Sequence, residues 1–297
     1  MKTVRALLDD AIGKFERAEL SYGHGTTNAL DEAAWLILHA LGLPHDELNP
    51  HLDTPLAESR WKAARALVDK RVRTRKPAAY LIHEAWLGPH RFYVDERVIV
   101  PRSFIAELLR AWKHPAPSAA LDLCTGSGCL AILMALAFPK AHVDAADLSP
   151  QALEVARRNV DDYALGERIE LVASDLFASL AGRRYDLIVS NPPYVKASSM
   201  RRLPDEYRKE PEMALASGVD GLEHTRAILA QARKHLKPGG LLVVEIGHNR
   251  KALERACPSL PFAWPKVSAG AGFVFTLPRE ALPERARGSV ETRGRVL

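Results

Sequence analysis

The sequence is poor in cysteine and has no long apolar run. Its 297 residues include three cysteines, Cys124, Cys129 and Cys257. Their spacing matches no metal-binding pattern, so we predict no metal site, and an odd, small number of thiols is typical of a reducing, cytoplasmic environment. No apolar stretch approaches the roughly 20 residues that span a bilayer. Residues 1–10 contain no apolar signal core, so we predict neither a membrane protein nor a secreted one.

The charge balance is also unexceptional. Lysine and arginine number 41 against 36 acidic residues, which gives a net charge of +5 and a pI of about 9.1. This mild excess is compatible with an RNA-rich partner but does not require one. With 47% hydrophobic and 26% charged residues, the composition is that of a globular protein long enough for one large and one smaller domain.

Residues 1–80 predict a small helical domain. Apolar residues recur at helical spacing in three segments, residues 4–15, 30–41 and 56–73. Gly42 and Pro44 end the second of these helices. His24 lies in the turn between the first two and has no partner ligands nearby in the sequence. We therefore interpret it as a hydrogen-bonded turn residue rather than a metal ligand.

Two features follow this domain. The basic run from Lys70 to Lys76 precedes Pro77 and is open to two interpretations, a solvated helix end that suits the helix dipole or a weak contact for rRNA phosphates. We favour the first. Residues 81–118 then predict a connector, because aromatic and β-branched residues flank Gly88-Pro89 as in a hairpin, and an amphipathic helix follows.

Residues 119–280 predict an α/β domain that binds a nucleotide-like ligand. A strand ending at Cys124 is followed by Thr125, Gly126, Ser127 and Gly128 and then by an apolar helix. In such a turn the glycines let a ligand approach the backbone, and the helix N-terminus offers unpaired N–H groups. The next strand ends at Asp147, about 20 residues after the glycines, where a carboxylate can accept ribose hydroxyls.

The next two strands end in further candidate residues. After the strand over residues 169–173, Asp175 can accept an adenine amino group, and Leu176 or Phe177 can cover its ring. The alternative for Asp175 is a helix N-cap. The strand over residues 185–189 ends at Asn191-Pro192-Pro193-Tyr194. Two prolines cannot continue a central strand, so the chain leaves the sheet there in a stiff loop.

The Asn-Pro-Pro-Tyr loop offers an amide, backbone carbonyls and a flat ring. Together these groups can hold a planar amide or an aromatic amine by accepting its N–H hydrogens. The alternative is a proline-rich turn without function. Beyond it, residues 198–210 predict a charged, substrate-facing flap, and residues 237–240 a turn between a helix and the strand over residues 241–247. A last strand covers residues 272–277, and residues 281–297 predict a disordered tail.

The order of glycine turn, ribose acid, adenine acid and Asn-Pro-Pro-Tyr resembles the class I S-adenosylmethionine-dependent methyltransferases. More narrowly, the sequence resembles the HemK-like protein-glutamine N5-methyltransferases, in its Asn-Pro-Pro-Tyr, in Glu210-Pro211 and in residues 218–222. Within that group, residues 22–33, 79–82 and 92–103 are similar to the branch that acts on large-subunit ribosomal protein L3. Phe104 departs from the proline expected there.

The resemblance implies a class I Rossmann-like fold, with helices on both faces of a mostly parallel seven-stranded sheet. It implies that S-adenosylmethionine donates a methyl group to a glutamine side-chain nitrogen of ribosomal protein L3, free or in an assembly intermediate. The implied cofactor-binding residues are Asp122, Cys124, Thr125, Gly126, Gly128, Asp147, Leu148, Asp175, Leu176 and Asn191. The implied substrate-binding residues are Arg102, Asn191, Pro192, Pro193 and Tyr194, of which Asn191, Pro192 and Tyr194 are catalytic.

Three alternatives remain open. Peptide release factors are the glutamine substrates of the other HemK-like branch. An adenine-N6 methyltransferase also needs to hold a planar, conjugated amine, but it would have a target-recognition segment and a stronger basic face. A non-enzymatic RNA-binding assembly factor would use residues 70–76, although the sequence contains no recognisable RNA-binding module.

Overall fold

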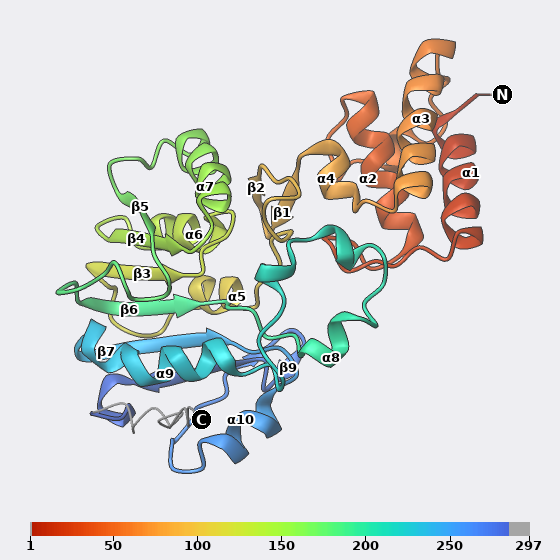
Figure 1. Cartoon of the computed structure of the whole chain (residues 1–297). Coiled ribbons are helices and arrows are strands. Elements are labelled where there is room, and N and C mark those ends of the chain that lie inside the picture. Colours follow the sequence, from red (N-terminus) through yellow and green to blue (C-terminus); the bar gives the residue numbers. More distant parts are fainter. Residues whose placement is uncertain (1, 285–297) are drawn as a thin grey trace. The chain divides into compact units, whose positions relative to one another are not determined.

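The structure, a computed structural model, describes residues 2–284 and divides into two compact units (Figure 1). The first comprises Met1–Arg102 with Arg201–Glu212, and the second Ser103–Met200 with Met213–Leu297. Each unit is described by itself. Of the tail expected from residue 281, the first four residues are described and Leu282 is buried, while residues 285–297 lie outside the described part.

The first unit is helical, as predicted. Its helices are α1 (Val4–Arg17), α2 (Ala29–Leu41), α3 (Glu58–Thr74) and α4 (Ala78–Ile82), with short 3-10 turns η1 (Asn49–His51) and η2 (Tyr207–Lys209). Asn28 caps α2 by accepting the Asp31 N–H at 2.9 Å, and Gly42 ends it in the left-handed conformation. The predicted hairpin is present as β1 (Ala85–Leu87) and β2 (His90–Phe92). Local signals therefore set both ends of α2.

The basic run is not the uniformly solvated helix end that we favoured. The side chain of Arg71 is fully buried and donates to Glu32 at 2.5 Å and to Glu206 at 3.4 Å. Arg75 ion-pairs with Glu206 at 3.0 Å. Glu206 belongs to the segment that we expected to be a charged flap, yet it is completely buried. The pairing partners lie far apart in the sequence, which is why the run appeared solvated.

The second unit contains a six-stranded, mostly parallel sheet with helices on both faces (Figure 1). The strand order is β10-β7-β6-β3-β4-β5, and only β10 runs antiparallel to its neighbour. The strands are β3 (Ala119–Leu123), β4 (His142–Asp147), β5 (Ile169–Ala173), β6 (Tyr185–Ser190), β7 (Leu236–Glu245) and β10 (Val274–Pro278). The helices are α5 (Ile105–Arg110), α6 (Cys129–Ala137), α7 (Pro150–Asp162), α8 (Ala197–Met200), α9 (Glu223–His235) and α10 (Arg250–Ala256). This arrangement confirms the predicted fold class.

The sheet has one strand fewer than the seven expected from the resemblance. Beyond β10, Ala263 is the only residue within 2–284 that pairs, through an isolated antiparallel bridge to Thr276. The two residues exchange N–H···O bonds of 3.1 and 2.9 Å. In an antiparallel ladder the next residues to bond the same neighbour lie two positions away. Here these are Pro261 and Pro265, which have no N–H to donate, so the seventh strand is reduced to a single bridge.

The turn expected at residues 237–240 lies inside β7. On β6, Tyr185 pairs with Leu236 and Leu187 pairs with Leu241, so the register shifts between them. The extra residues of β7 are accommodated by Gly239, which has a left-handed φ of +73°. The turn residues therefore form an irregularity within a strand rather than its boundary. A short hairpin of β8 (Lys266–Val267) and β9 (Gly270–Ala271), which we did not predict, follows α10.

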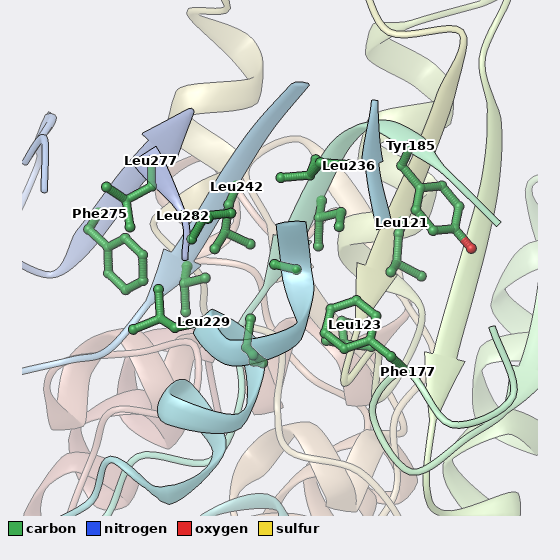
Figure 2. Packing of buried hydrophobic residues seen from close by; sticks show 14 of the residues in the cluster. Leu121, Leu123, Phe177, Tyr185, Leu229, Leu236, Leu242, Phe275, Leu277 and Leu282 are labelled. Atoms are coloured by element: carbon green, nitrogen blue, oxygen red, sulfur yellow. The ribbon is translucent and has the colours of Figure 1, made fainter. Parts of the chain in front are cut away.

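One hydrophobic cluster packs α9 against the sheet (Figure 2). The side chains labelled there are Leu121, Leu123, Phe177, Tyr185, Leu229, Leu236, Leu242, Phe275, Leu277 and Leu282. Full burial of each large apolar side chain contributes about 1.5–3 kcal/mol. Because a one-residue slip would move every side chain of a strand to the opposite face of the sheet, this packing fixes the register in which the parallel strands end.

Candidate active site

The strand register brings the predicted site residues to one edge of the sheet. Leu123 of β3 pairs with Ser190 of β6 on one side and with Ala146 of β4 on the other. The residues that follow these three positions are Cys124, Asn191 and Asp147. They therefore leave the sheet as neighbours, at the carboxyl ends of the strands where open α/β sheets bind ligands.

The glycine turn begins with strained backbone. Cys124, Gly126 and Gly128 have φ values of +63°, +56° and +80°, all in the left-handed region. A Cβ atom on Gly128 would lie 3.1 Å from that of Ala156 on α7, so glycine is needed there for close helix packing. A Cβ atom on Gly126 would meet nothing within 4 Å, so this glycine is needed only for its conformation.

Asp122 lies beneath this turn and is completely buried. One of its oxygens, Oδ2, accepts hydrogen bonds from the Thr125 hydroxyl at 2.5 Å and from the Ala131 N–H at 3.0 Å. The other, Oδ1, is buried without a hydrogen-bond partner among the described residues. Burial raises the pKa of this carboxyl to about 7, although the two hydrogen bonds oppose the shift. Asp122 thus fixes the turn and also holds one polar atom that a ligand can satisfy.

Asp147 joins the end of β4 to the glycine turn. Its two oxygens accept the N–H groups of Gly126 at 2.8 Å and Ser149 at 2.9 Å. Burial raises the pKa of Asp147, and these backbone hydrogen bonds oppose the shift. The next residue, Leu148, is 57% exposed. A large apolar side chain held in solvent beside a glycine turn is suited to cover an apolar part of a ligand.

The chain after β5 places Asp175 and Leu176 at the same edge of the sheet as Cys124, Asp147 and Asn191. Phe177 does not lie there. Asp175 is exposed, and the backbone of Leu176 is left-handed with φ +47°. This turn directs Phe177 inward, where it is buried and stacks on His235 at a centroid distance of 4.5 Å. Our expectation that Phe177 could cover an adenine ring is therefore wrong, because that ring is part of the hydrophobic core (Figure 2).

The Asn-Pro-Pro-Tyr loop leaves β6 as predicted. The Ser190 hydroxyl donates to the Leu123 carbonyl at 2.7 Å and so fastens the end of β6 to β3. Pro192 and Pro193 are buried. The Asn191 Oδ1 atom is buried and has no hydrogen-bond partner among the described residues. An amide oxygen held in this way by a stiff loop is an acceptor ready for an N–H donor.

Residues that we did not predict brace the chain after this loop. The Asn249 side chain donates to the Tyr194 carbonyl at 2.8 Å. Residues 215–218 run alongside residues 195–197, joined by N–H···O bonds from Val195 to Leu215 and from Ser217 to Val195, each 2.8 Å. The Ala197 N–H also donates to the Gly218 carbonyl at 2.9 Å, so the motif at residues 218–222, which carried part of the resemblance, supports the loop. No local sequence signal links these segments.

The Tyr194 ring packs directly on Gly247. A Cβ atom at Gly247 would lie 2.7 Å from a Tyr194 ring carbon, and φ at Gly247 is +54°. We expect Gly247→Ala to displace the ring and lower kcat by up to about 10²-fold, the loss that a 1 Å misplacement near the reacting atoms can cause. Steady-state kinetics and thermal melting test this. Gly182→Ala, at an open left-handed glycine with φ +78°, controls for backbone strain, and an equal loss of kcat there would contradict the steric explanation.

Glu245 was also missed, although it ends β7. It is buried and accepts hydrogen bonds from the Ser103 hydroxyl at 2.7 Å and from the Phe104 N–H at 2.9 Å. Phe104 stands where the resemblance led us to expect proline. Proline has no N–H and could not make the second bond, so this departure adds an anchor between the start of α5 and the sheet.

Arg102, predicted to bind substrate, belongs to the first unit and is engaged there. Its guanidinium makes two hydrogen bonds to the Glu210 carboxylate, at 2.5 and 2.6 Å. Although burial opposes it, Arg102 together with His24 lowers the pKa of Glu210 to about 2. His24 is buried in its turn, 3.5 Å from Glu210. Among residues 2–284, no group of three or more His, Cys, Asp or Glu side chains could hold a metal ion.

Comparisons with known proteins identify the family of this chain. A family model described as "Methyltransferase small domain" matches residues 105–206, and one described as "PrmC N-terminal domain" matches residues 17–82. The ribosomal protein uL3 glutamine methyltransferase of Neisseria meningitidis serogroup B is 56% identical over 95% of this chain and 95% of that protein. The protein of the same name from Burkholderia pseudomallei is 52% identical, over 95% and 96%. This chain therefore belongs to the ribosomal protein uL3 glutamine methyltransferases, within the HemK-like family.

Proposed function

We propose that this chain methylates the side-chain amide nitrogen of a glutamine in ribosomal protein uL3. Relatives that carry this activity in their names align with 95% of the chain. The observation that carries the proposal is the buried, unpartnered Oδ1 atom of Asn191 in a stiff loop. Because the substrate is a ribosomal protein, we place the activity in the cytoplasm. None of the helices of residues 2–284 is long and apolar enough to cross a membrane.

The methyl donor is S-adenosylmethionine, and the residues at the sheet edge fit it. The unpartnered Asp122 oxygen suits a cationic ligand, the left-handed glycines allow close backbone approach, and Leu148 offers an exposed apolar surface. When bound, the cofactor supplies an electrophilic methyl group on a sulfonium. We propose that it is held by Asp122, Cys124, Thr125, Gly126, Gly128, Asp147, Leu148, Asp175, Leu176 and Asn191.

The chain's own task is to present a poor nucleophile. The lone pair of an amide nitrogen is delocalised into its carbonyl, so the nitrogen attacks weakly. We propose that Asn191 Oδ1 and the Pro192 carbonyl each accept one hydrogen of the substrate amide, which polarises it and fixes its orientation. Pro193 keeps this geometry stiff, and Tyr194 packs on the amide plane. The rate gain comes from positioning and preorganised dipoles rather than from a strong base.

Binding of S-adenosylmethionine should weaken as the pH falls through 7. Asp122 has a pKa of about 7, and a cationic ligand favours its ionised form. Binding at pH 6 should therefore be about tenfold weaker than at pH 8. Titration calorimetry across this range measures how steeply the binding constant changes with pH. The same titrations on Asp122→Asn show the part of this slope that comes from the ligand's own ionisation. Equal slopes for both proteins would contradict the assignment.

For the stability of the ligand-free protein, the raised pKa of Asp122 predicts the opposite dependence on pH. The folded pKa of Asp122 lies above the unfolded value of about 3.9. Between these values the folded chain retains a proton that the unfolded chain has lost. The Asp122 contribution to stability therefore declines as the pH rises from about 4 to 7. Denaturant titrations of the native protein and Asp122→Asn should diverge in this window, and parallel curves would oppose the assignment.

The proposed substrate is tested by methyl transfer from labelled S-adenosylmethionine to uL3, a peptide release factor and unmethylated DNA in parallel. We expect label on uL3 alone, lost when its acceptor glutamine is replaced. Label on the release factor would retain the chemistry but overturn the substrate assignment. Label on DNA would mean that the loop holds an adenine amine instead of an amide.

The form of the substrate is a finer part of the proposal. We propose that uL3 is methylated free or in an assembly intermediate, with at most weak rRNA contact. Within the basic run, Arg71 and Arg75 are occupied by ion pairs with Glu206, and Lys76 pairs with Glu96. Few cations of the run remain for phosphates. Comparing rates on free uL3 and on precursor particles distinguishes the two substrate forms.

A further inference from the structure

The helical unit contains a pocket that the methyl-transfer chemistry does not use. Its volume is about 310 Å³, within the range of small-ligand sites. It lies between the start of α2, the residues after α2 and the β1 strand. The lining residues that matter here are Asp31, Trp35, His45, Asp46, Leu48 and Trp86. All of them belong to the first unit.

The aromatic walls of this pocket are held rigidly. The indole N–H groups of Trp35 and Trp86 both donate to the same oxygen of Glu84, Oε1. The distances are 3.2 Å from Trp35 and 2.9 Å from Trp86. His45 stacks on Trp86 with ring centroids 3.8 Å apart and planes inclined by 14°. The shared acceptor restrains both indoles, and the stacked His45 restrains Trp86 further. The walls are therefore preorganised for a ligand rather than collapsed onto one another.

The charges at the pocket are all of one sign. Asp31 and Asp46 line it, and no lysine or arginine does. Asp31 accepts a hydrogen bond from Asn28 at 2.7 Å, and Asp46 is 74% exposed and 3.9 Å from His45. Within residues 2–284, neither carboxylate is paired with a lysine or arginine. Two indoles with two available carboxylates suit a cation with an apolar stem.

We propose that this pocket binds a lysine or arginine side chain from a basic segment of the protein substrate. The inference rests on the proposed function. The cation would lie against the indole faces, the geometry of cation–π attraction, with its charge near Asp31 and Asp46 and its stem on Leu48. A nucleic acid is disfavoured, because the same carboxylates repel phosphate. The pocket thus gives the helical unit a way to select a basic protein independently of the glutamine.

The first test uses small probes and needs no methyl transfer. The chain has five tryptophans, whose indole N–H resonances can be followed by NMR. Nα-acetylarginine amide or Nα-acetyllysine amide should shift the Trp35 and Trp86 signals, whereas Nα-acetylglutamine amide at the same ionic strength should not. The shifts should disappear in the double variant Asp31→Asn/Asp46→Asn. Equal shifts with the neutral probe, or none with the cations, would overturn the proposal.

The second test measures kinetics on uL3. The double variant should raise KM for uL3 by about tenfold, as expected when the charge-assisted contacts to the two carboxylates are lost, with kcat and S-adenosylmethionine binding unchanged. Asp9→Asn, at an exposed residue of α1, is the matched control and should leave KM unchanged. If native protein does not methylate uL3, the proposed function fails while probe binding still tests the pocket. If methylation proceeds and KM does not change, the pocket assignment is wrong.

Discussion

Replacing Asn191 with alanine should lower kcat on uL3 by about 10²–10³-fold, the loss typical of removing one preorganised dipole that polarises a reacting group. The Oδ1 atom of Asn191 is buried and has no partner among the described residues, and the alanine side chain offers no acceptor in its place. Binding of S-adenosylmethionine should weaken by less than tenfold, because the other proposed cofactor residues remain. Single-turnover transfer and calorimetry separate the two effects.

A second substitution at this position distinguishes the role of the oxygen from that of the NH2 group. Asn191→Asp keeps an acceptor of nearly the same shape but cannot donate, so it should retain clearly more activity than Asn191→Ala. Asn49→Ala, at an exposed residue of the other unit, is the control for activity lost while the variants are prepared. If the aspartate variant were as inactive as alanine, the amide NH2 would be the working group. Full activity of Asn191→Ala with normal cofactor binding would refute the mechanism.

The catalytic edge of the sheet could be predicted from the sequence because its signals are local. A strand that ends in glycines, an acid at the end of the next strand and a double proline each specify a chain exit within a few residues. The parallel register then brings Cys124, Asp147 and Asn191 together without further information. The direction of Phe177 could not be predicted, because the left-handed backbone of Leu176 decides it.

The supports of the site could not be predicted for a different reason, which is the distance along the chain between partners. Arg102 and Glu210 are 108 residues apart, and Arg71 and Glu206 are 135. A single sequence contains no signal for such pairs. The segment from residue 198 to 210 therefore appeared as a charged flap, although two of its carboxylates are buried against arginines. The reduction of the seventh strand to a single bridge, in contrast, could have been predicted, because Pro261 and Pro265 are visible in the sequence.

The buried cluster around Arg71 leads to the largest expected effect on stability. Glu32 accepts from Arg71 through one oxygen and from the Thr26 hydroxyl at 2.9 Å through the other. Glu206 already has one buried oxygen without a partner. Arg71→Met retains the stem but leaves Glu32 without its cation and Glu206 with only Arg75. Removing one partner of a buried ion pair costs about 3–5 kcal/mol, because a charge remains in a poorly solvated site.

We therefore expect Arg71→Met to lower the free energy of unfolding of the helical unit by about 3–5 kcal/mol, with a loss of on the order of 10 °C in Tm. Arg73→Met, at an exposed residue of the same helix, should change stability by less than about 0.5 kcal/mol. Hydrogen exchange should also show lost protection in residues 201–212, which a general destabilisation of α3 would not single out. Equal effects of the two methionine variants would mean that the cluster contributes no more than a surface charge. A large loss confined to Arg71→Met would show that this basic residue stabilises the fold and is not available to RNA.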